Sequence, residues 1–302
     1  MNRLLRCAYL TMESLEGFFC SDSLTYQPLR DLGWSVEEVP WKKANVDWRS
    51  FDIVVIRSAW DYFKSPQTFL KVLEQIEKTG TRLANPLRVV KWNLDKSYLR
   101  ELEVQGTAIV PTLWNERLLQ SDLDSAFDHF ASEEIASEEI ASEELVVKPT
   151  IGAGACDTFR LNREAPDNFA EALDAFASRA VMIQPFLSSV VERGEFSLFF
   201  FGDEFSHCIS KLPKPGDFRV QEEHGGLIKV CPAESDMLAL SRRVLDAIGE
   251  PLLYARIDLV FLPSGELAVI EVELIEPSLY FGYDDRSASR FAAAVDRMYR
   301  YN

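Results

Sequence analysis

Apolar and polar residues alternate with a period of two along Leu252–Pro277, whose sequence is LLYARIDLVFLPSGELAVIEVELIEP. This period is typical of β-strands, and the Pro263–Glu266 segment that interrupts it has the composition of a turn. The segment is therefore predicted to form a hairpin of two strands. One face of this hairpin would present the charged residues Arg256, Asp258, Glu271 and Glu273, and the other the apolar residues Ile257, Leu259, Ile270 and Val272.

A hairpin that is symmetric about its turn pairs Asp258 with Glu271 and Arg256 with Glu273. Three carboxylates and one guanidinium on one patch of sheet are costly to bury without a partner. A divalent cation with oxygen ligands would supply that partner. A solvated, salt-bridged surface explains the same pattern when the hairpin is considered alone, because exposed charge pairs are common and contribute little free energy.

Residues 1–90 alternate between strand and helix patterns, which predicts a parallel sheet with helices packed on its faces. The expected strands are Leu4–Leu10, Trp34–Val39 and Phe51–Ile56, and the expected helices are Ser23–Leu32 and Pro66–Lys78. The segment after the third strand would lie at the carboxyl end of the sheet, where open α/β proteins bind ligands. Its candidates for a substrate pocket are Arg57, Ser58, Trp60 and Asp61, although an ordinary surface loop has the same composition.

The Asn85-Pro86 pair interrupts regular structure and marks a candidate domain boundary, after which the chain mixes shorter strands with helices. A helix is expected to follow Trp92–Leu99 and to end near Gly106. The other expected strands are 110–112, 145–149, 158–161, 181–186, 195–201 and 204–210, and the other helices are 166–179, 235–248 and 287–299. Residues 131–145 repeat the pentapeptide ASEEI with a period that fits neither helix nor strand, which indicates a surface insertion without an assigned role.

Composition limits the possible functions. The chain has 302 residues, of which 47% are hydrophobic and 20 are Phe, so we expect a globular protein of two or three domains. Its net charge of −16 argues against a nucleic-acid partner. The sequence has neither an apolar run of ~20 residues nor a signal-peptide pattern at its start, so no membrane partner and a cytoplasmic location are expected.

The five cysteines contain no C-x-x-C pair, which argues against both a zinc site and a disulfide framework. Cys156 lies in the Gly-rich loop Thr150–Asp157 and is a weak candidate for a catalytic thiol. That loop matches neither the Walker A nor the dinucleotide fingerprint, yet its glycines would let backbone N–H groups approach a phosphate. Lys148 on the preceding apolar strand strengthens this reading, because strand lysines recur in phosphoryl transfer; a lysine whose head reaches solvent from an edge strand is the alternative.

Together these parts resemble the ATP-grasp superfamily, and within it the glutathione-synthetase-like ligases. The resemblance covers Leu4–Arg297 and rests on the order and spacing of several segments. These are WNLDKSYL (Trp92–Leu99), VVKPTIGAGACDT (Val146–Thr158), MIQPF (Met182–Phe186), RGEFSLFFFGDEFSH (Arg193–His207), ARIDLV (Ala255–Val260) and VIEVELIEPSL (Val269–Leu279). The segments IRSAWDY, WNLDK and ELIEPSL are also similar to the subgroup that contains the ureido-serine cyclo-ligase of cycloserine biosynthesis.

The resemblance implies an α/β (α+β) ATP-grasp fold with three domains. Residues 1–90 would form an N-terminal parallel α/β domain on the substrate side, and residues 91–187 a small central domain that clamps the nucleotide. Residues 188–302 would form a C-terminal antiparallel-sheet domain that binds ATP and Mg²⁺. Among the implied ligands, the ATP-binding residues are Lys96, Lys148, Gly152, Gly154, Gln184, Phe186, Leu187 and Glu195.

In this scheme the two lysines contact phosphates, the glycine loop closes over them, and the Gln184–Leu187 segment holds the adenine. Glu195 takes the ribose, where the family usually has Asp. Asp258, Glu271 and Glu273 bind two Mg²⁺ ions, with Mn²⁺ as the alternative. Many relatives have Asn as the last of these ligands, so Glu273 adds a negative charge.

The implied reaction joins a carboxylate to an amine. The carboxylate attacks the γ-phosphate to give an acyl phosphate, and an amine then displaces phosphate, which requires charge neutralisation more than a protein nucleophile. Arg219 and Arg256 are the catalytic candidates for holding the acyl phosphate. Ser197 stands where relatives often have an Arg near the nucleotide, and the function of that Arg would pass to Arg193 or Arg219. Further candidates for substrate binding are Lys211, His224, Glu276 and Ser278.

The expected partner is a small carboxylate or amine substrate. Its identity, the choice between a ligase and a ring-closing cyclo-ligase, and the formation of a homo-oligomer are left open by the sequence. A non-catalytic nucleotide-binding protein that uses the same closure as a switch is the alternative from another class, and a phosphatase-like metallohydrolase is a weaker one.

Overall fold

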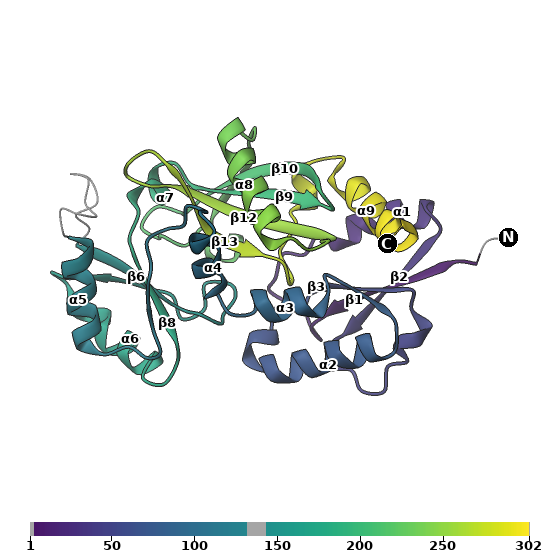
Figure 1. Ribbon diagram of the computed structural model, residues 1–302, viewed down its shortest axis with the longest axis horizontal. Coiled ribbons are helices and arrows are strands. Elements are labelled where there is room, and N and C mark those ends of the chain that lie inside the picture. Colours follow the sequence, from purple (N-terminus) through teal and green to yellow (C-terminus); the bar gives the residue numbers. More distant parts are fainter. Residues whose placement is uncertain (1–2, 132–142, 302) are drawn as a thin grey trace.

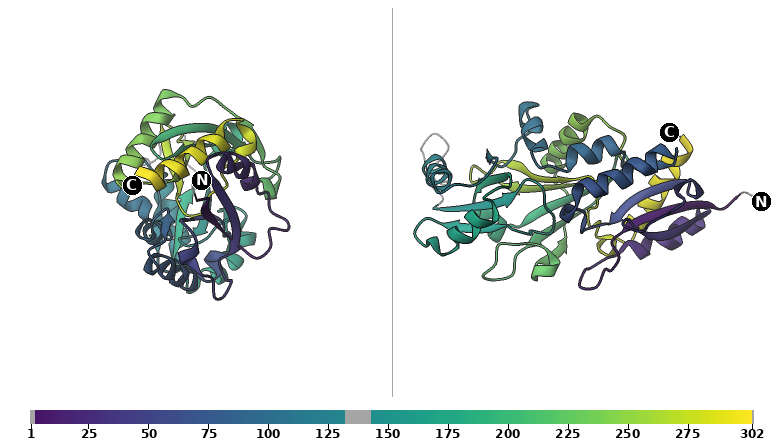
Figure 2. Two further views of the ribbon diagram at one scale, coloured as in Figure 1. Left: turned by 90° about the vertical axis from the view of Figure 1, so that its right-hand side faces the viewer. Right: turned by 90° about the horizontal axis from the view of Figure 1, so that it is seen from below.

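Three sheets follow one another along the long axis of the molecule (Figure 1). The computed structural model describes residues 3–131 and 143–301. The strand orders of the three sheets are β2-β1-β3-β4, β11-β10-β9-β12-β13 and β5-β8-β6-β7, and the five-stranded sheet lies between the other two (Figures 1 and 2). The mixture of one parallel and two antiparallel sheets confirms the predicted fold class.

The N-terminal sheet is parallel throughout, as its alternating pattern predicts. Its strands are β1 (Leu5–Thr11), β2 (Trp34–Pro40), β3 (Ile53–Ser58) and β4 (Arg82–Ala84), and its helices are α1 (Tyr26–Asp31) and α2 (Pro66–Lys78). Every residue of β3 is buried, which fits its central place in the sheet. Since β1 and β3 are parallel neighbours, the loops after both strands emerge at one edge.

The middle sheet is antiparallel and packs on both faces. Its elements are β9 (Glu195–Phe201), β10 (Glu204–Leu212), β11 (Leu227–Val230), β12 (Tyr254–Phe261), β13 (Leu267–Glu273), α8 (Ser235–Ile248) and α9 (Ser287–Tyr301). Leu198 and Phe200 pack with α8, whereas Phe199 and Phe201 pack with α9 and the N-terminal sheet. This alternation follows from the two-residue period of a strand and joins the middle sheet to the N-terminal one.

The third sheet forms its own core at the other end of the molecule. Its elements are β5 (Leu113–Asn115), β6 (Glu144–Pro149), β7 (Phe159–Asn162), β8 (Val181–Pro185), α5 (Gln120–Phe130) and α6 (Phe169–Ala175). Phe127 and Phe130 of α5 pack there against Leu145 and Val147. Most of the repeat at 131–145 lies outside the described residues, so its predicted place on the surface stays a prediction.

Short elements account for most differences from the predicted pattern. The helix expected to end near Gly106 is α4 (Tyr98–Val104), whereas α3 (Leu87–Asn93), α7 (Ser188–Glu192) and β11 were not predicted. The strand expected at 110–112 begins instead at Leu113, after a proline that cannot donate a hydrogen bond. These segments are too short for a period to show in the sequence.

The register of the β12–β13 hairpin is the predicted one at its charged end. Arg256 pairs with Glu273 and Asp258 with Glu271, but the register shifts between Asp258 and Leu259, which pairs with Val269. The prediction that Ile270 lies on the core face is therefore wrong, because the extra residue of this β-bulge turns Val269 into that core and Ile270 toward another cluster.

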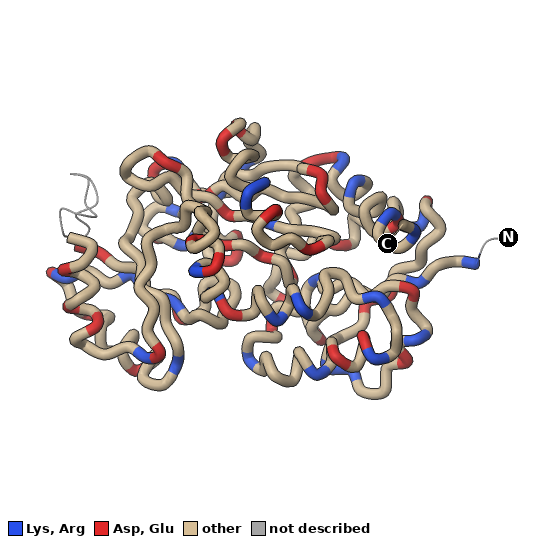
Figure 3. Tube along the Cα trace, viewed as in Figure 1, with Lys and Arg blue, Asp and Glu red and all other residues tan. Residues whose placement is uncertain are grey.

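Charged residues are mixed over the whole molecule. Lysine and arginine positions are interspersed with aspartate and glutamate along all three parts of the trace (Figure 3). Within the described residues, no helix combines the length and the apolar composition needed to span a membrane.

Candidate active site

A cleft of about 700 Å³ is lined by residues of the middle and third sheets and by loops that follow strands of the N-terminal sheet. The predicted site residues that line it are Lys96, Lys148, Gly152, Gly154, Gln184, Phe186, Leu187, Glu195, Arg219, Arg256, Asp258, Glu271, Glu273, Trp60, Asp61, Lys211, His224, Glu276 and Ser278. They come from segments more than two hundred residues apart in the sequence, from Trp60 to Ser278, and the fold brings them to one cavity. Of the predicted residues, Arg57 and Ser58 do not line it.

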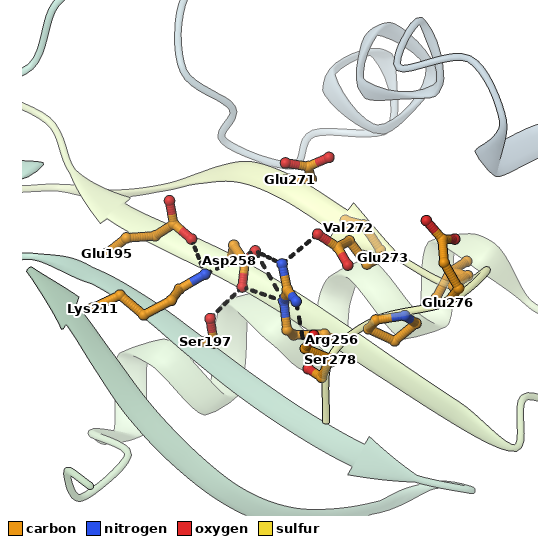
Figure 4. A network of polar contacts seen from close by, with 12 residues as sticks. Glu195, Ser197, Lys211, Arg256, Asp258, Glu271, Val272, Glu273, Glu276 and Ser278 are labelled. Atoms are coloured by element: carbon orange, nitrogen blue, oxygen red, sulfur yellow. Dashed lines mark hydrogen bonds and ion pairs between the residues drawn. The ribbon is translucent and has the colours of Figure 1, made fainter. Parts of the chain in front are cut away.

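Three carboxylates meet on the β12–β13 hairpin. One oxygen atom from each of Asp258, Glu271 and Glu273 lies within 4.8 Å of the others (Figure 4). Asp258 is buried, whereas the two glutamates are half-buried and open to the cleft. Three hard oxygen donors at this spacing suit Mg²⁺ or Mn²⁺ better than a soft metal, so the residues fit the metal that the sequence led us to expect.

The strand that supplies both glutamates is anchored along its outer edge. Because β13 is an edge strand, some of its backbone groups need partners outside the sheet. Asn93 donates from its side-chain amide to the Val272 carbonyl (2.8 Å) and accepts from the Leu274 N–H (2.9 Å). The Tyr98 hydroxyl accepts from the Val272 N–H at 2.8 Å. These bonds hold the backbone on either side of Glu273 in place.

Cations of the protein itself neutralise much of the cluster. Arg256 contacts Asp258 (2.8 Å) and also pairs with Glu273, between which it lies in Figure 4. Lys96 lies 3.2 Å from Glu271, measured from Nζ to Oε1. Lys211 lies 3.4 Å from Asp258, so each carboxylate of the cluster has a cation beside it.

The pKa values follow from burial and these pairs. Burial raises the pKa of Asp258, but the charges of Arg256 and Lys211 outweigh it and lower the pKa overall. Burial likewise raises the pKa of Glu271, and Lys96 and Lys148 lower it below its usual value. Burial raises the pKa of Glu273 to about 7, since the neighbouring carboxylates offset part of the effect of Arg256. Glu273 is therefore the member of the cluster that takes up a proton near neutral pH.

The Gly-rich loop is tied to the cluster through Lys96. The Lys96 ammonium donates to the Gly152 carbonyl at 2.8 Å, and its backbone N–H donates to the Thr150 carbonyl at 2.8 Å. A Cβ on Gly152 would lie 2.8 Å from Cγ of Pro149, so only glycine fits without a shift. Lys148 lines the same cleft, and burial lowers the pKa of its ammonium.

Another part of the cleft contains the residues that the sequence predicted to bind the nucleoside of ATP. Gln184 donates to the Thr112 hydroxyl at 2.9 Å, and Leu187 packs in an apolar cluster with Val110 and Val260. The ring of Phe186 lies under the Arg160 guanidinium at 3.7 Å. Glu195 pairs with Lys211, so one side chain links the predicted ribose ligand to the metal cluster.

Among the lining residues that the 213–226 loop supplies, Arg219 and His224 were predicted. Arg219 forms a salt bridge with Asp217 (3.0 Å) and is about a third exposed, and His224 lies on the same loop. Arg193, the other candidate to replace a cation near Ser197, stacks on Phe261 instead, at 3.3 Å from its ring. Ser197 itself donates to Asp258 at 2.5 Å and thus orients a predicted metal ligand.

The far side of the cleft is formed by loops after β1 and β3 and by the segment after β13. The Trp60 indole donates to the Glu276 carbonyl at 2.9 Å, and the Phe18 ring stacks on Trp60 with centroids 5.5 Å apart. Met12 and Phe18 were not predicted as site residues. The carboxyl-end argument that selected Trp60 after β3 applies equally to the loop after β1 and would have found them.

The structure corrects the placement of Arg57 and Ser58. Both are buried, and Arg57 pairs with Asp22 (2.8 Å) and donates to the Pro277 carbonyl at 3.1 Å. The guanidinium thus joins β3 to the segment after β13 and does not enter the cleft. Cys156 is exposed, but partial desolvation of its thiol and the negative charge of Asp157 raise its pKa, which disfavours a thiolate nucleophile.

Comparisons with known proteins match two parts of the chain to families. A family model described as the N-terminal domain of D-cycloserine synthetase DcsG matches residues 7–85. The ATP-grasp domain of prokaryotic glutathione synthetase matches residues 129–277.

Individual relatives extend over most of the chain. The cycloserine biosynthesis protein DcsG of Streptomyces lavendulae is 31% identical over 276 residues, which cover 88% of this chain and 89% of that protein. A glutathione synthetase of Nitrosomonas europaea is 25% identical over 249 residues, covering 80% of this chain and 68% of the relative. The crystal structure of D-cycloserine synthetase DcsG superposes with a TM-score of 0.83 at 29% identity, over 98% of this chain and 100% of that one.

Proposed function

This chain belongs to the ATP-grasp family of ligases, and from that premise we propose that it is an ATP- and Mg²⁺-dependent carboxylate–amine ligase or cyclo-ligase. Its substrate would be a small molecule that resembles an amino acid. The reaction would pass through an acyl phosphate, with ATP converted to ADP and phosphate.

The observation that supports this proposal most directly is the carboxylate cluster in a cleft that also contains lysines. Asp258, Glu271 and Glu273 lie together, and Lys96 and Lys148 face the same space. A binding module has little need for three anionic metal ligands beside phosphate-binding cations. A catalyst of phosphoryl transfer needs both, since its main task is to neutralise developing charge.

We assign the residues of the cleft as follows. Asp258, Glu271 and Glu273 would hold Mg²⁺, which when bound supplies positive charge to the phosphate oxygens. Lys96 and Lys148 would bind the phosphates under the loop of Gly152 and Gly154. Gln184, Phe186 and Leu187 would hold the adenine, and Glu195 the ribose.

The reacting carboxylate would lie near Arg256, whose guanidinium already binds two carboxylates of the cluster. Arg219 on the 213–226 loop would add a second cation when that loop approaches the body. Both would stabilise an acyl phosphate by charge-assisted hydrogen bonds. Trp60, Asp61, Lys211, His224, Glu276 and Ser278 would form the surrounding substrate pocket.

The three sheets also support the proposed division at residues 1–90, 91–187 and 188–302, because each sheet falls inside one of these segments. The similarity to the cycloserine biosynthesis protein DcsG favours a ring-closing reaction on a ureido or aminooxy amino acid over peptide-type ligation.

A phosphate-release screen tests the proposal. The purified protein is incubated with Mg·ATP and a panel of amino acids and their ureido and aminooxy derivatives, and each product is identified by mass spectrometry. We expect ADP and phosphate in equal amounts, together with a new C–N bond, only with the right carboxylate. ATP binding without phosphate release on any panel member would favour the switch alternative, and release without a second substrate would favour a hydrolase.

A further inference from the structure

A second cavity of about 180 Å³ adjoins the cleft, and we call it the Asp22 chamber. It shares Trp60, Ser278 and Tyr280 with the cleft, so the two spaces meet at these side chains. Its remaining wall includes Asp22, from the turn after β1, and Glu222, from the 213–226 loop. No role in the proposed reaction has been assigned to either carboxylate.

The chemistry of the wall selects for a cation. The described residues that line the Asp22 chamber include two carboxylates, Asp22 and Glu222, and no lysine or arginine. Four aromatic side chains complete much of the wall, namely Phe19, Trp60, Tyr280 and Tyr283. Aromatic faces attract an organic cation by about 0.5–2 kcal/mol each, more than they attract a neutral or anionic group.

Asp22 offers a hydrogen-bond acceptor that the protein leaves unused. The residue is 5% exposed, and its Oδ1 accepts from Nε and Nη2 of Arg57 at 3.2 and 2.8 Å. Its Oδ2 is buried and has no hydrogen-bond partner among the described residues. A buried carboxylate oxygen without a donor is costly, by about 1–3 kcal/mol or more for a charged group. A ligand N–H in the chamber would remove that cost.

The part of the Asp22 chamber wall that contains Glu222 belongs to the 213–226 loop. Its carboxylate accepts from the Tyr283 hydroxyl at 2.9 Å, which ties the 213–226 loop to the segment before α9. The same loop supplies Arg219 and His224 to the main cleft. A cation between Asp22 and Glu222 would therefore draw this loop toward the body of the protein.

We propose that the Asp22 chamber binds the ammonium group of a small amino-acid substrate. The Ser278 carbonyl, on the shared wall, accepts from Arg256 at 3.4 Å, and Arg256 lies at the metal cluster. An amino acid could thus place its ammonium in the chamber while its carboxylate remains near Arg256. Identifying this carboxylate as the one that is activated rests on the proposed function; the preference of the chamber for an ammonium group does not.

The test is equilibrium binding by calorimetry to the full-length protein saturated with Mg²⁺ and a non-hydrolysable ATP analogue. The probes are both enantiomers of serine, together with ethanolamine, and 3-hydroxypropionate is the counterpart of serine that lacks the amine. We expect serine or ethanolamine to bind, and Asp22→Asn and Glu222→Gln each to raise its dissociation constant at least tenfold. The dissociation constants of 3-hydroxypropionate and of the nucleotide should be unchanged.

A control variant and the second test variant keep the outcome interpretable. Asp285→Asn makes the same carboxylate-to-amide change at an exposed position near Tyr283 and should leave all binding unchanged. Glu222→Gln lies on a partly exposed loop, so it reports on the chamber even if Asp22→Asn disturbs the buried Arg57 and fails to fold.

Several outcomes would overturn the proposal. These are that no amine binds the wild-type protein, that 3-hydroxypropionate binds as tightly as serine, or that Glu222→Gln leaves amine binding unchanged. Competition by KCl that disappears in the same variant would mark a site for a monovalent metal ion instead. Failure of the ligase proposal is separate, because it would show as absent phosphate release while amine binding and its dependence on Glu222 persist.

Discussion

Replacing Glu271 by Gln should abolish catalysis while leaving the folded protein about as stable as before. The substitution would remove both the repulsion between Glu271 and its neighbouring carboxylates and its attraction to Lys96. Glu271 lies within 4.8 Å of the other two carboxylates, which at an effective dielectric constant of ~20 corresponds to a repulsion of at least ~3.5 kcal/mol for each charged neighbour. Its attraction to Lys96 at 3.2 Å corresponds to ~5 kcal/mol in the same approximation.

The repulsions offset the attraction to Lys96. Because the pKa of Glu273 is about 7, that neighbour is charged only part of the time at neutral pH, so the total repulsion on Glu271 is also ~5 kcal/mol. Burial of the carboxylate disfavours its charge and Lys148 favours it, and the pKa of Glu271 ends below its usual value. We therefore expect the free energy of unfolding of Glu271→Gln without metal to change by less than ~2 kcal/mol, a shift of a few degrees in Tm for a protein of this size. A structural ion pair would behave differently, since breaking one partner of a buried pair costs ~3–5 kcal/mol.

Metal binding, in contrast, should fall steeply. Even groups that only orient a metal ligand contribute about 10–100-fold to affinity, so loss of a direct anionic ligand should weaken Mg²⁺ binding by more than ~100-fold. Calorimetric titration with Mg²⁺ and the ATP analogue measures this, and phosphate release measures the loss of turnover. The matched control is Glu74→Gln, which removes a carboxylate of α2 that pairs with Lys91 of α3, far from the cluster in sequence. It should change neither quantity. Full turnover in Glu271→Gln, or destabilisation by several kcal/mol, would refute the assignment of Glu271 as a metal ligand.

Three other predictions concern the same cleft. Lys148→Met should raise the dissociation constant of ATP at least tenfold with little loss of stability, because burial already lowers the pKa of this lysine; unchanged affinity would make it merely structural. Gly152→Ala should weaken nucleotide binding more than folding, since the new Cβ would meet Pro149 at 2.8 Å, and equal losses measured by calorimetry and thermal unfolding would contradict this. Mg²⁺ affinity of the free protein should rise as pH increases through about 7, where Glu273 loses its proton, and a Glu273→Gln variant that keeps the same pH dependence would show that another group is responsible.

The charged hairpin shows how far the sequence alone leads. A two-residue period and one turn were sufficient to predict that Asp258 faces Glu271, because any slip by one residue would bury the charges. The β-bulge beside them was not predictable, since one inserted residue leaves the apolar pattern of the strand almost unchanged. Its effect is local but functional: Ile270 lines the cleft, where the symmetric hairpin would have placed it in the core.

Arg57 shows a different limit. The parallel pattern correctly predicts which edge of the N-terminal sheet borders the cleft, and Trp60 and Asp61 line the cleft there. Which individual side chain points into the cavity depends on partners that are distant in sequence. For Arg57 the partner is Asp22, on the loop after a neighbouring strand, and their pairing turns the guanidinium away from the cleft. Neither residue has a spacing or a motif that reveals this contact.

Contacts between residues distant in sequence also provide the ion pairs that a metal at the cluster would have to replace. Without a metal, the acids of the cluster are neutralised by Arg256, Lys96 and Lys211, and Glu273 retains a proton for part of the time. A metal bound at this cluster would exchange these ion pairs for metal–oxygen bonds. In the proposed reaction, the cations released from Glu271 and Glu273 would remain in the cleft to meet the phosphates and the substrate carboxylate. On this proposal Lys96 and Arg256 would serve the free and the occupied site in turn, which a set of carboxylates read from the sequence could not indicate.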